Sequence, residues 1–149
     1  MVVSYDVFMG AFLNKISEFE FLNIDDDNRE EIVDGYMKRA MTAFRKNCLH
    51  NLKAASDDTS REFNINIADG DLDEIVDIIS EGMVVQWMKP YVYNQELLEN
   101  VLNTRDYTQY SPGELLRRVG SAYEKVQRDY TQMIREYSYN HGALGELHS

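Results

Sequence analysis

The sequence has little cysteine, proline or glycine. One cysteine, Cys48, stands among its 149 residues, so no disulfide bond can form within the chain. Only two prolines and eight glycines are present, and this scarcity of residues that break regular structure favours helices. No apolar run approaches the roughly 20 residues of a membrane-spanning helix, and the first residues lack the pattern of a signal peptide. We therefore expect no contact with membranes and a location in the cytosol, unless the chain is packaged into a larger assembly.

Positive charge is also scarce. Fifteen Lys and Arg residues stand against 26 Asp and Glu residues, which gives a net charge of −11. This balance argues against a protein that binds nucleic acid over its whole surface, because phosphates would be repelled. Residues 1–104 hold nine basic and 20 acidic residues, whereas residues 105–149 hold six of each. The C-terminal part is therefore the part best suited to approach another macromolecule.

The length and composition predict one folded domain. A chain of 17.4 kDa with 44% hydrophobic residues has the usual size of a single domain and enough apolar surface to form a core. Apolar side chains at helical spacing predict a first helix over residues 5–21. A second helix is expected to begin after Asp27, which forms a capping box with Glu30, and to end near Cys48 or His50.

The middle of the chain predicts a central helix. The segment from Asp71 to Pro90 is the most apolar one; Asp71 and Glu74 are placed to cap its start, and Pro90 is expected to end or sharply bend it. A shorter helix is expected over residues 94–102. Apolar and polar residues alternate over residues 63–67, which indicates a short extended segment or ordered loop. The sequence offers that segment no partner strand, so no sheet is expected.

The clearest helix start is Ser111-Pro112-Gly113-Glu114, where serine caps, proline occupies the first turn and glutamate completes the capping box. Apolar residues then recur at alternating steps of three and four: Leu116, Val119, Tyr123, Val126, Tyr130, Met133 and Tyr137. This rhythm predicts a long helix packed along its length. The three tyrosines leave open whether the seam faces the core of the chain or a partner.

These elements together predict an all-α fold, a small helical bundle of four to five helices with a long C-terminal helix and a flexible C-terminal tail. Residues 1–137 form the single helical-bundle domain, and residues 138–149 form the tail.

Residues for catalysis or metal binding are few. There are three histidines, no Gly-x-Ser-x-Gly motif and no glycine-rich phosphate loop. Cys48 and His50, two apart on the expected helix, make a poor metal pair. The run Asp69-x-Asp71-x-Asp73 begins like a calcium loop, but its sixth position is not glycine and its twelfth is not glutamate. We therefore predict no enzyme, no bound metal and no cofactor.

One basic group interrupts the acidic sequence. It lies on and just beyond the second expected helix and comprises Lys38, Arg39, Arg45, Lys46 and Lys53. Contact with nucleic acid is one interpretation. Docking of a partner protein or salt bridges between subunits is the interpretation that the acidic remainder favours.

Four stretches carry a resemblance to a known family. They are residues 31–40 (EIVDGYMKRA), 81–90 (EGMVVQWMKP), 99–116 (ENVLNTRDYTQYSPGELL) and 137–142 (YSYNHG). Together they resemble the small neck proteins of tailed bacteriophages, which are head-tail connectors or head-completion adaptors that dock beneath the portal. The resemblance spans about residues 30–142.

This resemblance implies a structural protein of the virion. Its copies would form a homo-oligomeric ring beneath the portal protein, contact a tail-side neck or tail-completion protein, and continue a channel through which DNA passes without specific binding. The location would be the head–tail junction, with the host cytoplasm as the site of assembly.

The resemblance also suggests roles for particular residues. Portal contacts in this family are often made by C-terminal segments, which here gives Tyr137, Tyr139, Asn140, His141, Leu144 and Leu147. Expected subunit contacts are Lys38, Arg39, Arg45, Lys46, Phe63, Ile65, Tyr123 and Tyr130.

Two other classes stay open. A DNA-packaging or regulatory helical protein would bind nucleic acid through the basic group, in a salt-sensitive way. An enzyme built from dispersed carboxylates would be stabilised against heat by a divalent metal.

Overall fold

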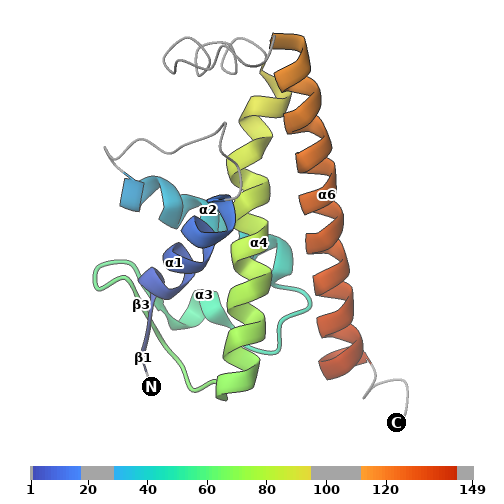
Figure 1. The fold of residues 1–149 in the computed structure, drawn as a ribbon. Helices are drawn as coiled ribbons and strands as arrows, with labels where there is room; N and C mark the ends of the chain where they lie inside the picture. The colour runs from blue at the N-terminus through green and yellow to red at the C-terminus, as the bar shows by residue number, and fades with distance from the viewer. Residues whose placement is uncertain (1, 18–28, 95–111, 144–149) are drawn as a thin grey trace.

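The computed structural model describes residues 2–17, 29–94 and 112–143, and most of these are helical (Figure 1). The helices are α1 (Tyr5–Ile16), α2 (Arg29–Phe44), α3 (Leu52–Ala55), α4 (Asp69–Tyr93) and α6 (Pro112–Ser138), which continues as the π-helix η1 (Tyr139–Ala143). The predicted helical bundle with a long C-terminal helix is confirmed. Three short strands, β1 (Val2–Ser4), β2 (Ser56–Asp57) and β3 (Glu62–Asn64), accompany the helices.

Helix α4 is the centre of the molecule, as the sequence predicts. It contacts α1, α2 and α6. In Figure 1 α6 runs antiparallel along one side of α4, α1 and the small sheet lie on the other, and α2 passes behind it. Its apolar side chains project in most directions, because partners surround it. The fully buried ones include Ile75, Ile79, Met83, Trp87 and Met88.

Both ends of α4 differ from the prediction. The helix begins at Asp69 after Ala68, and no side chain caps it, so the capping role expected of Asp71 and Glu74 is wrong. Asp69 and Asp71 instead lie in the first turn, where the helix dipole favours negative charge. Pro90 does not end the helix, which continues to Tyr93. Proline lies one turn from the end, where losing one hydrogen bond disturbs few others.

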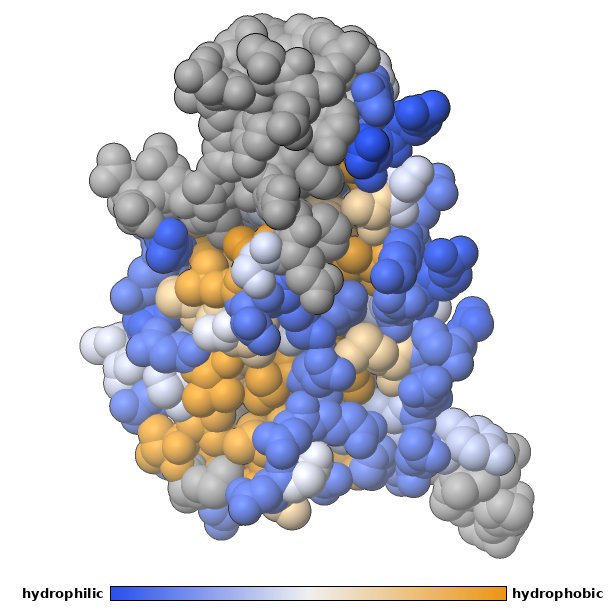
Figure 2. All heavy atoms as spheres, in the orientation of Figure 1, coloured by the Kyte–Doolittle hydropathy of each residue, from blue (hydrophilic) through white to orange (hydrophobic). Residues whose placement is uncertain are grey.

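The seam of α6 faces the core of the chain. Its positions Val119, Tyr123, Val126, Tyr130 and Tyr137 are buried, and Leu116 and Met133 pack against the same core. The outward face carries charged residues, and Figure 2 shows hydrophilic side chains along the exposed side of this helix. The alternating three- and four-residue spacing therefore reflects packing of α6 against α4 and the other core elements.

The small sheet corrects the prediction that residues 63–67 have no partner strand. β3 pairs antiparallel with β1, with Val3 opposite Phe63, and also with β2, with Ser56 opposite Phe63. The order is β1-β3-β2. Strands of two or three residues are too short to show an alternating pattern, so the sequence does not reveal β1 and β2.

Two helices end earlier in the sequence than predicted. Helix α1 ends at Ile16, and α2 ends at Phe44. The backbone N–H groups of Asn47 and Cys48 both donate to the carbonyl of Phe44 and close this end.

Two predicted segments fall outside the described residues. One is the helix expected over residues 94–102, apart from its first position, Asn94, which follows α4. The other is residues 144–149 of the expected tail. Within the described part of the chain, no helix has the length and hydrophobicity needed to cross a bilayer.

Candidate docking site beside helix α2

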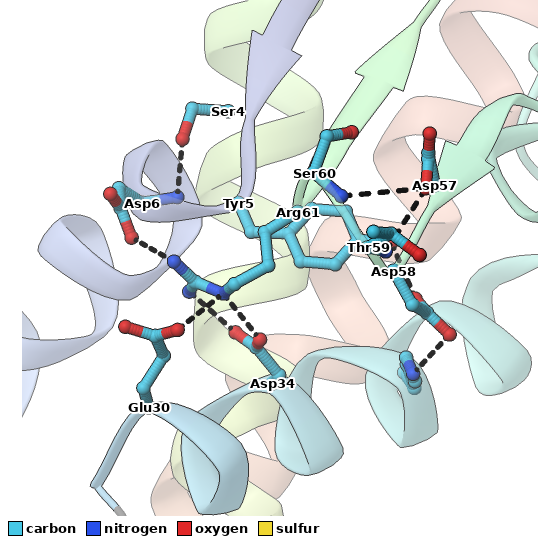
Figure 3. Close-up of polar contacts among 11 residues, drawn as sticks. Ser4, Tyr5, Asp6, Glu30, Asp34, Asp57, Asp58, Thr59, Ser60 and Arg61 are labelled. Atoms are coloured by element: carbon cyan, nitrogen blue, oxygen red, sulfur yellow. Dashed lines mark hydrogen bonds and ion pairs between the residues drawn. The ribbon is translucent and has the colours of Figure 1, made fainter.

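An arginine joins the sheet to the first two helices. Arg61 lies in the turn before β3 with φ of 55°, which is the left-handed region and is uncommon for residues other than glycine. Its guanidinium binds both carboxylate oxygens of Asp34 on α2, with Nε–Oδ2 at 2.7 Å and Nη2–Oδ1 at 2.9 Å. It also pairs with Asp6 at 2.8 Å and Glu30 at 3.2 Å (Figure 3). The two-pronged contact fixes the position of the turn against α2.

The electrostatics of this cluster are those of a structural clamp. The side chains of Arg61 and Asp34 are only 18% and 16% exposed. The hydrogen bonds that Arg61 donates to Asp34 are the main cause that raises the pKa of Arg61 above its ordinary value. The positive charge of this arginine is therefore balanced by carboxylates of the same chain. The backbone of Tyr5 adds a further tie, since its N–H donates to the carbonyl of Arg61 at 2.9 Å.

Tyr5 leads from this clamp to a second ion pair. Its hydroxyl donates to Asp58 at 2.8 Å, and Asp58 accepts from Lys38 on α2 at 2.8 Å. Burial raises the pKa of Tyr5 to about 12, with Asp58 adding to the shift. Lys38, and then Tyr5, lower the pKa of Asp58. Since Lys38 and Asp58 are both well exposed, the pair positions the turn more than it stabilises the fold.

A pocket of about 370 Å³ opens beside this pair. It lies between the C-terminal half of α2, the connection after it, α3 and β2, since these elements supply its lining. Its apolar part is formed by Met37, Met41, Phe44 and Leu52. Its size lies within the range of ordinary ligand-binding pockets.

Lysine and arginine side chains also line this pocket. Lys38, Arg45 and Lys53 belong to its lining. Lys38 is paired with Asp58, whereas Arg45 and Lys53 make no ion pair with any residue in the described ranges. The pocket therefore joins an apolar interior with two uncompensated positive charges, on a chain whose net charge is −11. Such a combination suits an occupant that is both apolar and acidic.

Cys48 and His50 also line the pocket. The prediction that both lie on a helix is wrong, because α2 ends at Phe44 and both residues lie in the connection after it. Burial raises the pKa of the Cys48 thiol, which lowers its reactivity. His50 Nε2 is buried and has no hydrogen-bond partner among the described residues. No group of three or more His, Cys, Asp and Glu side chains in residues 2–17, 29–94 and 112–143 is placed to hold a metal ion.

The residues expected to contact a portal lie in different environments. Tyr137 is 0% exposed, packs edge-on against Phe44 at 5.0 Å, and its hydroxyl accepts a hydrogen bond from the Leu49 N–H. It is a core residue, so its assignment to a portal contact is corrected. His141 stacks on Tyr137 with ring centroids 4.4 Å apart and lies 3.3 Å from Glu74.

Two other residues of this set are exposed. Tyr139 is 60% exposed, and Asn140 is exposed beside it. Leu144 and Leu147 lie outside the described residues. The end of α6 is thus anchored at Tyr137 and at His141, and between these anchors it presents Tyr139 and Asn140 to solvent.

The expected subunit-contact residues divide into two groups. Arg39, Arg45 and Lys46 are exposed, and Lys38 is exposed while paired with Asp58. The apolar members are occupied inside the chain, which corrects their assignment to a surface, except that Ile65 is only half-buried. These occupied members are Phe63, Tyr123 and Tyr130.

The contacts of the occupied members show their structural roles. Phe63 packs against Tyr5, with ring centroids 4.8 Å apart, and β3 thereby closes over α1. The Tyr130 hydroxyl donates to the Ala40 carbonyl at 2.9 Å, a buried bond between α6 and α2. A Cβ built on Gly82 would lie 2.7 Å from Tyr130 Cζ, so α4 meets this ring without a side chain between them.

The sequence reveals part of this site. It singles out the basic group, but the pocket joins that group to α3 and β2, which have no recognisable pattern. The Arg61 clamp is missed altogether, since its partners are 27 to 55 residues away in the sequence.

Comparison of the chain with protein-family models, with curated proteins and with solved structures found no match.

Proposed function

We propose that the chain is a head-tail connector of a tailed bacteriophage, a structural adaptor that forms a ring beneath the portal, links capsid to tail and continues the DNA channel. The resemblance of about residues 30–142 to phage neck proteins motivates the proposal. The helical bundle is consistent with the fold that this family implies. The mechanism is assembly: net charge keeps single copies in solution, and docking then brings them together as a ring.

The observation that carries the proposal is the anchored end of α6. Tyr137 and His141 hold η1 against the rest of the domain, and Tyr139 faces solvent between them. An exposed aromatic side chain on a fixed backbone loses little conformational entropy when it binds, which suits it to anchor a protein interface. In the proposed assembly this end meets the portal.

A binding experiment with purified portal rings tests this role. Tyr139→Ala is expected to weaken binding at least about tenfold, as loss of an anchor residue does, and deletion of residues 139–149 is expected to abolish it with the helical content retained. Tyr93→Ala is the matched control, because Tyr93 is another exposed tyrosine, at the C-terminal end of α4. Equal binding by Tyr139→Ala and Tyr93→Ala would contradict the assignment.

A second candidate is a DNA-packaging or regulatory protein that binds nucleic acid. It is favoured by the unpaired cations Arg39, Arg45, Lys46 and Lys53, which make no ion pair within the described residues. Phosphate contacts would give affinity for duplex DNA that falls steeply with added salt. Charge reversal at Arg45 and Lys53 would then reduce that affinity, whereas the connector proposal expects no such binding.

A further inference from the structure

The pocket beside α2 combines apolar walls with basic side chains that have no ionic partners among the described residues. Its walls Met41, Phe44 and Leu52 are apolar, and Arg45 and Lys53 stand at it without ionic partners among the described residues. An occupant that supplies apolar groups and negative charge would match both the apolar walls and the two cations.

The chain itself contains a segment of this chemistry. Residues 18–28 read EFEFLNIDDDN, with two phenylalanines, a leucine, an isoleucine and five carboxylates within eleven residues. We infer that the pocket beside α2 receives residues 18–28 of a second copy of this chain. The apolar side chains enter between Met41, Phe44 and Leu52, and the carboxylates meet Arg45 and Lys53.

Reach favours a second copy over the same copy. Tyr5, at the start of α1, lines the pocket, and Ser17 follows the end of α1 twelve residues later, about 18 Å away at the helical rise. A chain covers at most about 3.3–3.6 Å per residue. Residues 18–22 would have to be fully extended to return to their own pocket, whereas a neighbouring copy meets no such limit.

Such a contact joins two different surfaces, one on each copy. A contact of this head-to-tail kind leaves one pocket and one segment free at the ends, so each added copy can bind the next, and the chain closes into a ring where the rotation permits. The inference deepens the proposed connector function by naming the subunit contact. Its chemistry depends only on residues of this chain.

Charge reversal in the full-length protein tests the contact. Sedimentation of the wild-type chain is expected to show a mass that rises with concentration. The double variant Arg45→Glu/Lys53→Glu is expected to associate at least about tenfold more weakly, and so is Asp25→Lys/Asp27→Lys. Mixing the two double variants is expected to restore association in pairs, because the unaltered segment of the pocket variant can bind the unaltered pocket of the segment variant. That restoration also shows that both variants are folded.

A labelled peptide of residues 18–28 gives a second measurement. It is expected to bind the dilute full-length chain, and Arg45→Glu/Lys53→Glu is expected to weaken binding at least about tenfold. The matched control is Lys125→Glu/Arg128→Glu, which makes the same change of charge on exposed positions of α6 and should leave peptide binding nearly unchanged.

Several results would overturn the inference. They are a wild-type chain that stays monomeric at all concentrations, association that tolerates both charge reversals, and rescue only when all four substitutions stand on one chain. The first two remove the contact, and the third makes it internal to one copy. The connector function fails separately, if the chain is missing from virions while the contact between copies persists.

Discussion

Replacement of Gly82 by alanine tests the packing at the centre of the bundle. Gly82 is buried on α4, where α2 and α6 both approach it. An added Cβ would lie 2.7 Å from Tyr130 Cζ and 2.8 Å from Ala40 Cβ. Carbon atoms pack best at about 3.5–4.0 Å, so the neighbours would have to retreat by roughly 0.8 Å.

Neither neighbour is free to retreat. The Tyr130 ring is held by α6 at one end and by its hydrogen bond to the Ala40 carbonyl at the other. Ala40 Cβ is attached directly to the backbone of α2. Overpacking of this kind costs about 1–3 kcal/mol, and we take the upper part of the range. The higher helix propensity of alanine returns about 1 kcal/mol, which leaves a net loss of about 1–2 kcal/mol.

Thermal and denaturant unfolding measure this loss. For a domain of this size the melting temperature is expected to fall by about 2–8 °C. Gly120→Ala is the matched control, since it lies within α6 and a Cβ built there meets nothing within 4 Å. It is expected to raise the melting temperature by about 2–4 °C through helix propensity alone. Equal stabilisation by both substitutions would refute the close approach of α4, α2 and α6.

Three further predictions concern polar groups. Tyr130→Phe removes the buried hydrogen bond to α2 and is expected to lower the free energy of unfolding by about 1 kcal/mol, measured in urea; an unchanged midpoint would contradict it. Arg61→Lys keeps the charge but loses the two-pronged contact with Asp34, so a loss of about 1–3 kcal/mol is expected, and full stability would show that the fork is unimportant. Burial raises the pKa of Tyr130 and of Tyr137 to about 12, against about 10 in the unfolded chain; stability is therefore complete below pH 10 and falls as pH rises towards 12. Titration of tyrosinate absorbance follows these residues, and ionisation of every tyrosine near pH 10 in the folded protein would contradict their burial.

The helical architecture could be predicted because its signals are local and repeated. The seam from Leu116 to Tyr137 shows the same spacing over six intervals, and the apolar segment ending at Pro90 is hydrophobic enough to identify the central helix. The start of α6 at Pro112 matches its capping motif. Each of these features depends on neighbours within a few residues, which a sequence displays directly.

The remaining features depend on contacts between distant residues. Whether Tyr130 faces a partner or the core is decided by Ala40, 90 positions away, and helical spacing is the same in both cases. β1 and β2 exist because β3 pairs with them. The candidate site follows the same rule: the basic group is visible in the sequence, but the pocket beside it requires α3 and β2 to be placed.

The most direct test of the connector function is the amount of this chain in purified phage particles. Quantitative mass spectrometry would measure its ratio to the portal protein. The proposal predicts that the chain is present at a fixed ratio, on the order of a dozen copies per particle, as a closed ring requires. Absence of the chain from particles that are complete and infectious would contradict the proposal and would favour the nucleic-acid-binding alternative.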